Sequence, residues 1–185
     1  ADNNYDGVAY CQGTTVCVST KYANSHPNDI GFFSHEITHS VQQYSGKLNY
    51  GDDVAWWTEN MANYGGFRYF HWSNPKYVQV YEATDTSLQD WGYEAYGNNK
   101  WFFSYMDSKY PTTKDSSGNV KYGLIDSLNH LLKVNKGTRY DDNPYDTSTP
   151  WNQLVKQITG YDCIESLRLH YVEELKNGTW TFTGF

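Results

Sequence analysis

The sequence predicts a single α+β domain that is mainly helical and has a short β-hairpin at its N-terminal end. Three observations lead to this prediction. The chain has 185 residues, a length typical of one domain. The first 20 residues have the pattern of a β-hairpin, and from Asp29 onward the pattern is mainly helical. No repeat, low-complexity linker or change of composition divides residues 1–185 into two domains.

The composition indicates a folded domain with an aromatic and rather polar core. The chain has 7 Trp, 18 Tyr and 8 Phe, and Trp and Tyr bury large apolar faces while keeping a polar tip for hydrogen bonding. The net charge is −7, without a cluster of Lys or Arg, which argues against nucleic acid and anionic membranes as partners. No uncharged apolar run approaches the roughly 18 residues of a spanning helix. The first residue is Ala and no signal peptide is recognisable, so we expect a mature or trimmed form, and a monomer.

Cys11 and Cys17 lie on the two arms of the predicted hairpin. If a three-residue loop over 13–15 joins the strands, these two residues lie directly opposite each other, at cross-strand distance. A disulfide between them and two unpaired thiols are equally compatible with the sequence. Cys163 comes at the start of a helical pattern, and we expect it to be a small buried apolar residue.

Six helices are expected after the hairpin, and they cover residues 29–45, 53–64, 95–109, 121–135, 150–160 and 162–176. Asn28 or Asp29 can cap the first of them. The pair Gly65-Gly66 follows the second and predicts its end. Asp162 begins a pattern similar to a capping box at the start of the last helix. The segments rich in turn residues are expected to be loops and cover 112–120 and 137–149.

The most informative residues are His35-Glu36-Ile37-Thr38-His39. Two histidines at positions i and i+4 of a helix lie on one face, one turn apart, where both rings can bind the same metal ion. The glutamate between them can take a proton from a water molecule bound to that ion. The chain has only 6 His, so a chance match to this pattern is improbable.

The helix that carries this motif also has an apolar face. Four residues at helical spacing form one stripe on the side of the helix opposite the two histidines, and they are Phe33, Ile37, Val41 and Tyr44. We therefore expect the stripe to be buried in the core. The histidines would then face a second surface, where the site lies.

A catalytic zinc ion has three protein ligands and an open position for water. Glu59 is the best candidate for the third ligand, because the 19 residues between His39 and Glu59 allow a helix end, a turn and an antiparallel return. Asn63 lies one helical turn beyond Glu59 and could accept a hydrogen bond from a ligating histidine. A position without that role is equally compatible with the sequence. The sequence thus predicts one Zn²⁺ ion bound by His35, His39 and Glu59.

The motif HExxH, followed about twenty residues later by a glutamate in a helix, resembles the gluzincin metallopeptidases, which have a zincin fold. A closer resemblance is to the basic secretory protein family of plants, fungi and bacteria, which consists of secreted zinc peptidases. Four stretches carry this resemblance, and they cover residues 6–19, 35–42, 59–64 and 96–107. Asn60 and Asn63 stand where that family has Gly and Asp. An N-terminal part of the family domain, about 70 residues long, has no counterpart in this chain.

The resemblance implies a secreted zinc endopeptidase with a single zincin-like domain and a protein or peptide substrate. Zinc would lower the pKa of its bound water, and Glu36 would take the proton of that water as it attacks a peptide carbonyl. Glu36 would then pass the proton to the leaving amine. Tyr96 is the candidate donor to the oxyanion, and His71 and His130 are weaker alternatives.

Two other functions fit the sequence less well. An enhancin-like peptidase directed at mucins and other glycoproteins has the same motif and a glutamate at a compatible distance, but it usually carries Gly where this chain has Thr38. A non-catalytic secreted binding module on a zincin fold would have no need of Glu36. The expected extracellular location rests on the possible Cys11–Cys17 bridge and on the resemblance.

Overall fold

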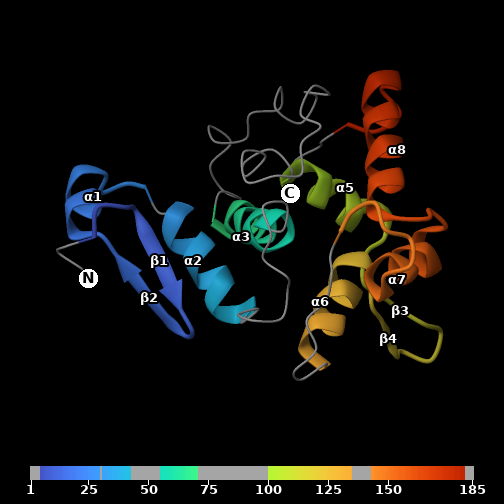
Figure 1. Ribbon diagram of the computed structural model, residues 1–185, viewed down its shortest axis with the longest axis horizontal. Helices are drawn as coiled ribbons and strands as arrows, with labels where there is room; N and C mark the ends of the chain where they lie inside the picture. The colour runs from blue at the N-terminus through green and yellow to red at the C-terminus, as the bar shows by residue number, and fades with distance from the viewer. Residues whose placement is uncertain (1–4, 30, 43–54, 71–99, 135–142, 182–185) are drawn as a thin grey trace.

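The computed structural model describes residues 5–29, 31–42, 55–70, 100–134 and 143–181. These residues form an α+β structure that is mainly helical, as predicted. The elements in chain order are β1 (Ala9–Gln12), β2 (Thr15–Val18), α1 (Thr20–Ser25), α2 (Gly31–Gln42), α3 (Ala55–Phe70), α5 (Lys100–Lys109), β3 (Thr113–Lys114), β4 (Val120–Lys121), α6 (Leu124–Val134), α7 (Pro150–Thr159) and α8 (Ile164–Asn177). In Figure 1 the hairpin β1–β2 and α1 lie at one end, α2 and α3 follow, and α5 to α8 lie at the other end. None of the described helices has the length and apolar character needed to cross a lipid bilayer.

The N-terminal hairpin has a register that differs by one residue from the predicted one. In the antiparallel pair β1–β2, Cys11 is opposite Val16 and Tyr10 is opposite Cys17. The connection is a two-residue turn that begins at Gly13, whose φ is 60°, so the predicted three-residue loop is wrong. Because successive side chains of a strand point to opposite faces, Cys11 and Cys17 lie on different faces of the hairpin. Both thiols are free, which is the second of the two alternatives.

One short helix and one small hairpin are not predicted by the sequence, and one cap differs from the predicted one. Helix α1 follows Ser19, whose hydroxyl accepts a hydrogen bond from the Tyr22 N–H at 3.3 Å. The strands β3 and β4 form a small hairpin in the segment predicted as a loop, and β4 extends to Lys121, the first residue of the helix predicted over 121–135. The cap of α8 is Cys163, while Asp162 forms an ion pair with Lys156 at 2.7 Å. Cys163 is buried, as predicted.

Helix α3 does not end at Gly65-Gly66, as the sequence predicts, but continues to Phe70. A Cβ atom at Gly65 would lie 2.7 Å from Thr38 Oγ1, and one at Gly66 would lie 2.8 Å from Ser34 Oγ. The two glycines therefore allow α2 and α3 to approach each other more closely than any side chain at these positions would permit. The packing of α2 against α3 outweighs the low helix propensity of the two glycines, so the helix continues through them.

Replacing Gly65 with alanine should destabilise the protein, although alanine is the better helix former. The new methyl group would overlap Thr38 Oγ1, and that hydroxyl already donates to the Ser34 carbonyl at 2.9 Å. We expect the free energy of unfolding to fall by about 1–3 kcal/mol, measured by chemical denaturation. Thr38→Ala removes the overlapping atoms, so Gly65→Ala should cost much less in that background. An equal cost in both backgrounds would exclude this contact as the cause.

The start of α2 agrees with the prediction, but the direction of its apolar stripe does not. Asp29 Oδ1 accepts a hydrogen bond from the Gly31 N–H at 3.0 Å, as a capping residue does. Phe33 is 44% exposed and Val41 is 66% exposed, and Tyr44 lies outside the described residues. The buried residues of α2 are Ser34, His35, Glu36 and Gln42. The helix therefore packs with its histidine face inward, because that face makes the close contact and the polar contacts with α3.

The hydrophobic core lies on the other side of α3, among α3, α5, α6, α7 and α8, and it is aromatic as predicted. The Trp57 ring lies 4.7 Å from the Phe103 ring and 4.8 Å from the Trp151 ring, centroid to centroid. The largest fully buried side chains include Trp57, Trp101, Trp151, Tyr105, Phe102 and Phe103. Helix α3 thus contributes to the core with one face and holds α2 with another, which gives the contact between α2 and α3 a rigid support.

Candidate metal centre

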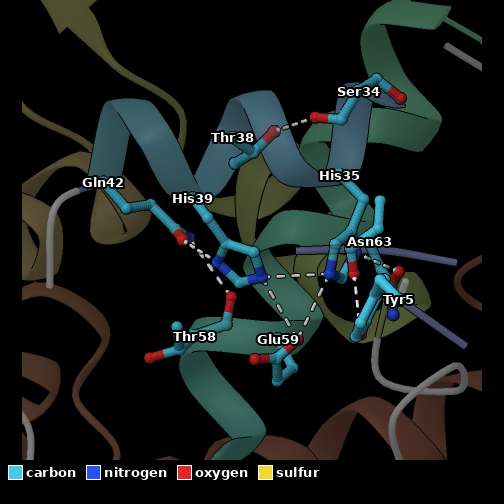
Figure 2. A network of polar contacts seen from close by, with 10 residues as sticks. Tyr5, Ser34, His35, Thr38, His39, Gln42, Thr58, Glu59 and Asn63 are labelled. Carbon is cyan, nitrogen blue, oxygen red and sulfur yellow. Dashed lines mark hydrogen bonds and ion pairs between the residues drawn. The ribbon is translucent and has the colours of Figure 1, made fainter. Parts of the chain in front are cut away.

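His35 and His39 of α2 and Glu59 of α3 bring three ligand atoms together (Figure 2). The two Nε2 atoms are 3.0 Å apart, and Glu59 Oε2 lies 3.3 Å from each of them. The three side chains come from two helices, and the close contact at Gly65 and Gly66 sets the distance between those helices. These three residues could hold a metal ion. They are the three that the sequence nominates as ligands.

Both imidazole rings are held through their other nitrogen atom. His35 Nδ1 donates to Asn63 Oδ1 at 2.8 Å, and His39 Nδ1 donates to Gln42 Oε1 at 2.9 Å. The orientation of the Gln42 amide follows from its Nε2, which donates to the Thr58 carbonyl at 3.3 Å. With a proton on each Nδ1, both Nε2 atoms direct a lone pair toward the same point. The hydrogen bond predicted for Asn63 is therefore present.

The spacing of the three ligand atoms is close to that of the ligands of a tetrahedral ion. Ligand atoms about 2.0–2.2 Å from a zinc ion lie about 3.3–3.6 Å apart at tetrahedral angles. The observed separations are 3.0, 3.3 and 3.3 Å. Three lone pairs that converge in this way repel one another, and a cation at their centre removes the repulsion. Two imidazoles and a carboxylate also form one of the ligand sets of catalytic zinc, so the residues fit this ion.

The charges of Glu59 and His39 depend on each other. In the absence of a cation, a ring can also carry a proton on Nε2 and donate it to Glu59. Burial would raise the pKa of Glu59, but such hydrogen bonds from the two histidines outweigh it and lower the pKa to about 2. Burial would lower the pKa of His39, whereas its contacts with Glu59 and Gln42 and the charge of Glu36 raise it above the ordinary value. The Glu59 carboxylate is consequently ionised at neutral pH, as a metal ligand must be.

No protein-family model, curated protein or solved structure matches this chain. The resemblance to gluzincins and to the basic secretory protein family therefore stays a prediction. The function has to be argued from the geometry of the site.

Glu36 is buried beside the ligand residues, with 8% of its surface exposed. Burial raises its pKa above the ordinary value, the two imidazoles lower it in part, and the charge of Glu59 raises it further. The charge of Glu36 also contributes, after burial, to the raised pKa of the Cys11 thiol on β1. The carboxyl group is thus near both the ligand atoms and the hairpin. A carboxylate that binds a proton more readily than usual is suited to general base catalysis.

Of the residues predicted as oxyanion donors, only His130 lies in the part of the chain that the structure describes. Tyr96 and His71 lie outside the described residues. His130 is exposed on α6, where its ring stacks on Tyr122 with 5.4 Å between the ring centroids. None of the interactions described for His130 involves a ligand residue.

Gln42 is the site residue that the sequence analysis does not assign a role. It is buried at the end of α2 and contacts His39, three residues before it. Residues three apart on a helix are neighbours on its surface. An amide at this spacing after the second histidine is therefore the signal by which the sequence could have indicated a partner for the ring.

Proposed function

We propose that this protein is a secreted, zinc-dependent endopeptidase. The observation that carries the proposal is the convergence of His35 Nε2, His39 Nε2 and Glu59 Oε2 beside the buried carboxyl group of Glu36. A zinc ion held by these three atoms would supply Lewis-acid activation of a water molecule and of the substrate carbonyl. A site for metal storage alone would need no buried carboxylate next to its ligands.

In this mechanism Glu36 carries the proton. The Glu36 carboxylate accepts a proton from the attacking water, whose oxygen forms a bond to the peptide carbonyl carbon. The same carboxyl group then donates that proton to the nitrogen of the leaving amine as the C–N bond breaks. Glu36 is largely shielded from bulk water, and exclusion of water from a site limits the loss of protons to the solvent. Asn63 and Gln42 keep the two rings oriented throughout.

The hairpin supports a peptide as the class of substrate. Strands β1 and β2 both pack against α2, and among the described strands each of them pairs only with the other. The hairpin therefore has strand edges to which an extended peptide can add through main-chain hydrogen bonds. The extracellular location rests on the resemblance, because the free thiols of Cys11 and Cys17 give it no further support.

The proposal predicts that hydrolysis of an unfolded protein substrate disappears in the presence of a chelator and returns when Zn²⁺ is added. Return of activity with Zn²⁺ but not with Mg²⁺ or Ca²⁺ is expected, because a site with two imidazoles favours transition metals. Hydrolysis that continues after the zinc has been removed, as shown by elemental analysis, would rule out a zinc peptidase.

The same assay distinguishes the other two functions. Cleavage of a mucin-type glycoprotein, without cleavage of the same polypeptide after deglycosylation, would indicate a mucin-directed peptidase. Zinc binding without cleavage of either substrate would indicate a binding module.

A further inference from the structure

We propose that Gln42 is a positioning residue that selects the tautomer of His39 and ties its ring to the part of α3 that carries Glu59. The inference rests on the proposed zinc site. It goes beyond that site because Gln42 is neither one of the three ligands nor part of the proton transfer.

Gln42 uses both ends of its amide group (Figure 2). Its Oε1 accepts a hydrogen bond from His39 Nδ1 at 2.9 Å, and its Nε2 donates to the Thr58 carbonyl at 3.3 Å. The side chain is 6% exposed, so a partner lost at either end would leave a buried polar group unsatisfied. Thr58 directly precedes Glu59 on α3. One side chain thus connects the second ligand of α2 to the backbone beside the third ligand.

The two contacts together fix the proton on His39. Since the amide nitrogen is used by the Thr58 carbonyl, only the amide oxygen faces the ring. An oxygen acceptor requires a proton on Nδ1 of His39, which leaves the Nε2 lone pair available for a cation. The reversed amide would place an N–H group against Nδ1. The ring would then carry its proton on Nε2, where it would block the ligand position.

His35 reaches α3 by a more direct route. Its Nδ1 donates to Asn63, which is itself part of α3. Both rings of α2 are therefore connected to α3, one through Asn63 and the other through Gln42 and Thr58. Both acceptors are neutral amides instead of carboxylates, and the carboxylate of Glu59 lies 3.3 Å from the Nε2 atom of each ring. Neutral partners raise the basicity of the ligand nitrogens less than a carboxylate would.

The test compares the intact chain with Gln42→Met and Gln42→Glu. Methionine has a similar length but provides neither contact, whereas glutamate keeps an oxygen acceptor for His39 and loses the donor to Thr58. The matched control is Gln153→Met, because Gln153 is an exposed helical glutamine whose Nε2 donates to the Ser148 carbonyl at 3.2 Å.

The measurements are the dissociation constant for Zn²⁺, by competition with a chromophoric chelator, and the visible absorption spectrum with Co²⁺ in place of zinc. Gln42→Met should weaken zinc binding by about 10–100-fold and change the cobalt spectrum, because the ring is no longer held. Gln42→Glu keeps an acceptor for His39 Nδ1 and makes it anionic, so it should bind zinc more tightly than Gln42→Met. The control should match the intact chain in both measurements.

Equal zinc affinity and equal cobalt spectra for the intact chain and a folded Gln42→Met variant would overturn the inference and leave the zinc site standing. Failure of the intact chain to bind zinc would overturn the proposed site, and the inference with it. Should Gln42→Met not fold, nitrogen NMR of the zinc-loaded intact chain decides the question. We expect a proton on His39 Nδ1, and coordination through Nδ1 would contradict the role of Gln42.

Discussion

Replacing Glu36 with glutamine should lower peptide hydrolysis by about 10²–10⁴-fold and leave zinc binding intact. Glutamine has nearly the same shape as glutamate, but its amide cannot accept the proton of the attacking water. The ligand atoms lie on other residues, so the ion should be retained at the same stoichiometry. The measurement is kcat/KM on a peptide substrate, together with zinc content determined by elemental mass spectrometry.

The matched control for this variant is Glu173→Gln on α8, where the glutamate is exposed. It makes the same chemical change on a helix that carries none of the ligand residues, and it should leave hydrolysis unchanged. If Glu36→Gln retained a large share of the activity with its zinc in place, another group would have to act as the base. If it lost zinc as well, Glu36 would have a role in the stability of the site.

The group of His35, His39 and Glu59 is the part of this protein that the sequence predicts best, because most of it is local. The spacing of His35 and His39 within one helix determines that their rings meet. Helical spacing likewise places Asn63 one turn after Glu59 on α3. Only the contact between α2 and α3 joins residues that are far apart in the chain. The spacing between His39 and Glu59 is sufficient to predict it.

The packing of α2 shows where local pattern fails. An apolar stripe predicts a buried face, yet Phe33 and Val41 are exposed and the histidine face is buried. Three polar side chains of that face, His35, His39 and Gln42, have hydrogen-bond partners on α2 or α3, which offsets part of the cost of burying them. The glycine pair 65–66 led to a wrong prediction for the same reason. Its local meaning is a helix end, but its tertiary role is to admit α2 at close range.

The remaining differences concern elements too short to have a period. Helix α1 has a capping serine, Ser19, but too few residues for an apolar repeat. In the first hairpin the sequence around Gly13 is compatible with turns of two or three residues. A change of one residue in that turn moves Cys17 to the opposite face of the hairpin, away from Cys11. A small ambiguity in a turn thus decided whether a disulfide could form.

Replacing His39 with alanine should deprive the protein of its zinc. Only two of the three ligands would remain. Removing a residue that merely hydrogen-bonds to a ligand typically lowers metal affinity by up to about 100-fold, so removing a ligand itself should lower it by more. After dialysis against metal-free buffer, we expect about one zinc per chain in the unaltered protein and almost none in the variant. His130→Ala is the matched control, because His130 is an exposed histidine of α6.

Thermal unfolding gives an independent measure of the same loss. A ligand that binds only the folded state stabilises it by about 2.7 kcal/mol when its concentration is 100 times the dissociation constant. Zinc should therefore raise the Tm of the unaltered protein and of His130→Ala, and leave that of His39→Ala unchanged. Glu59→Gln keeps an oxygen at the third position but loses its charge, so its Tm should rise less than that of the unaltered protein. An equal rise in Tm for His39→Ala would show that zinc binds elsewhere. The group of His35, His39 and Glu59 would then not hold the ion.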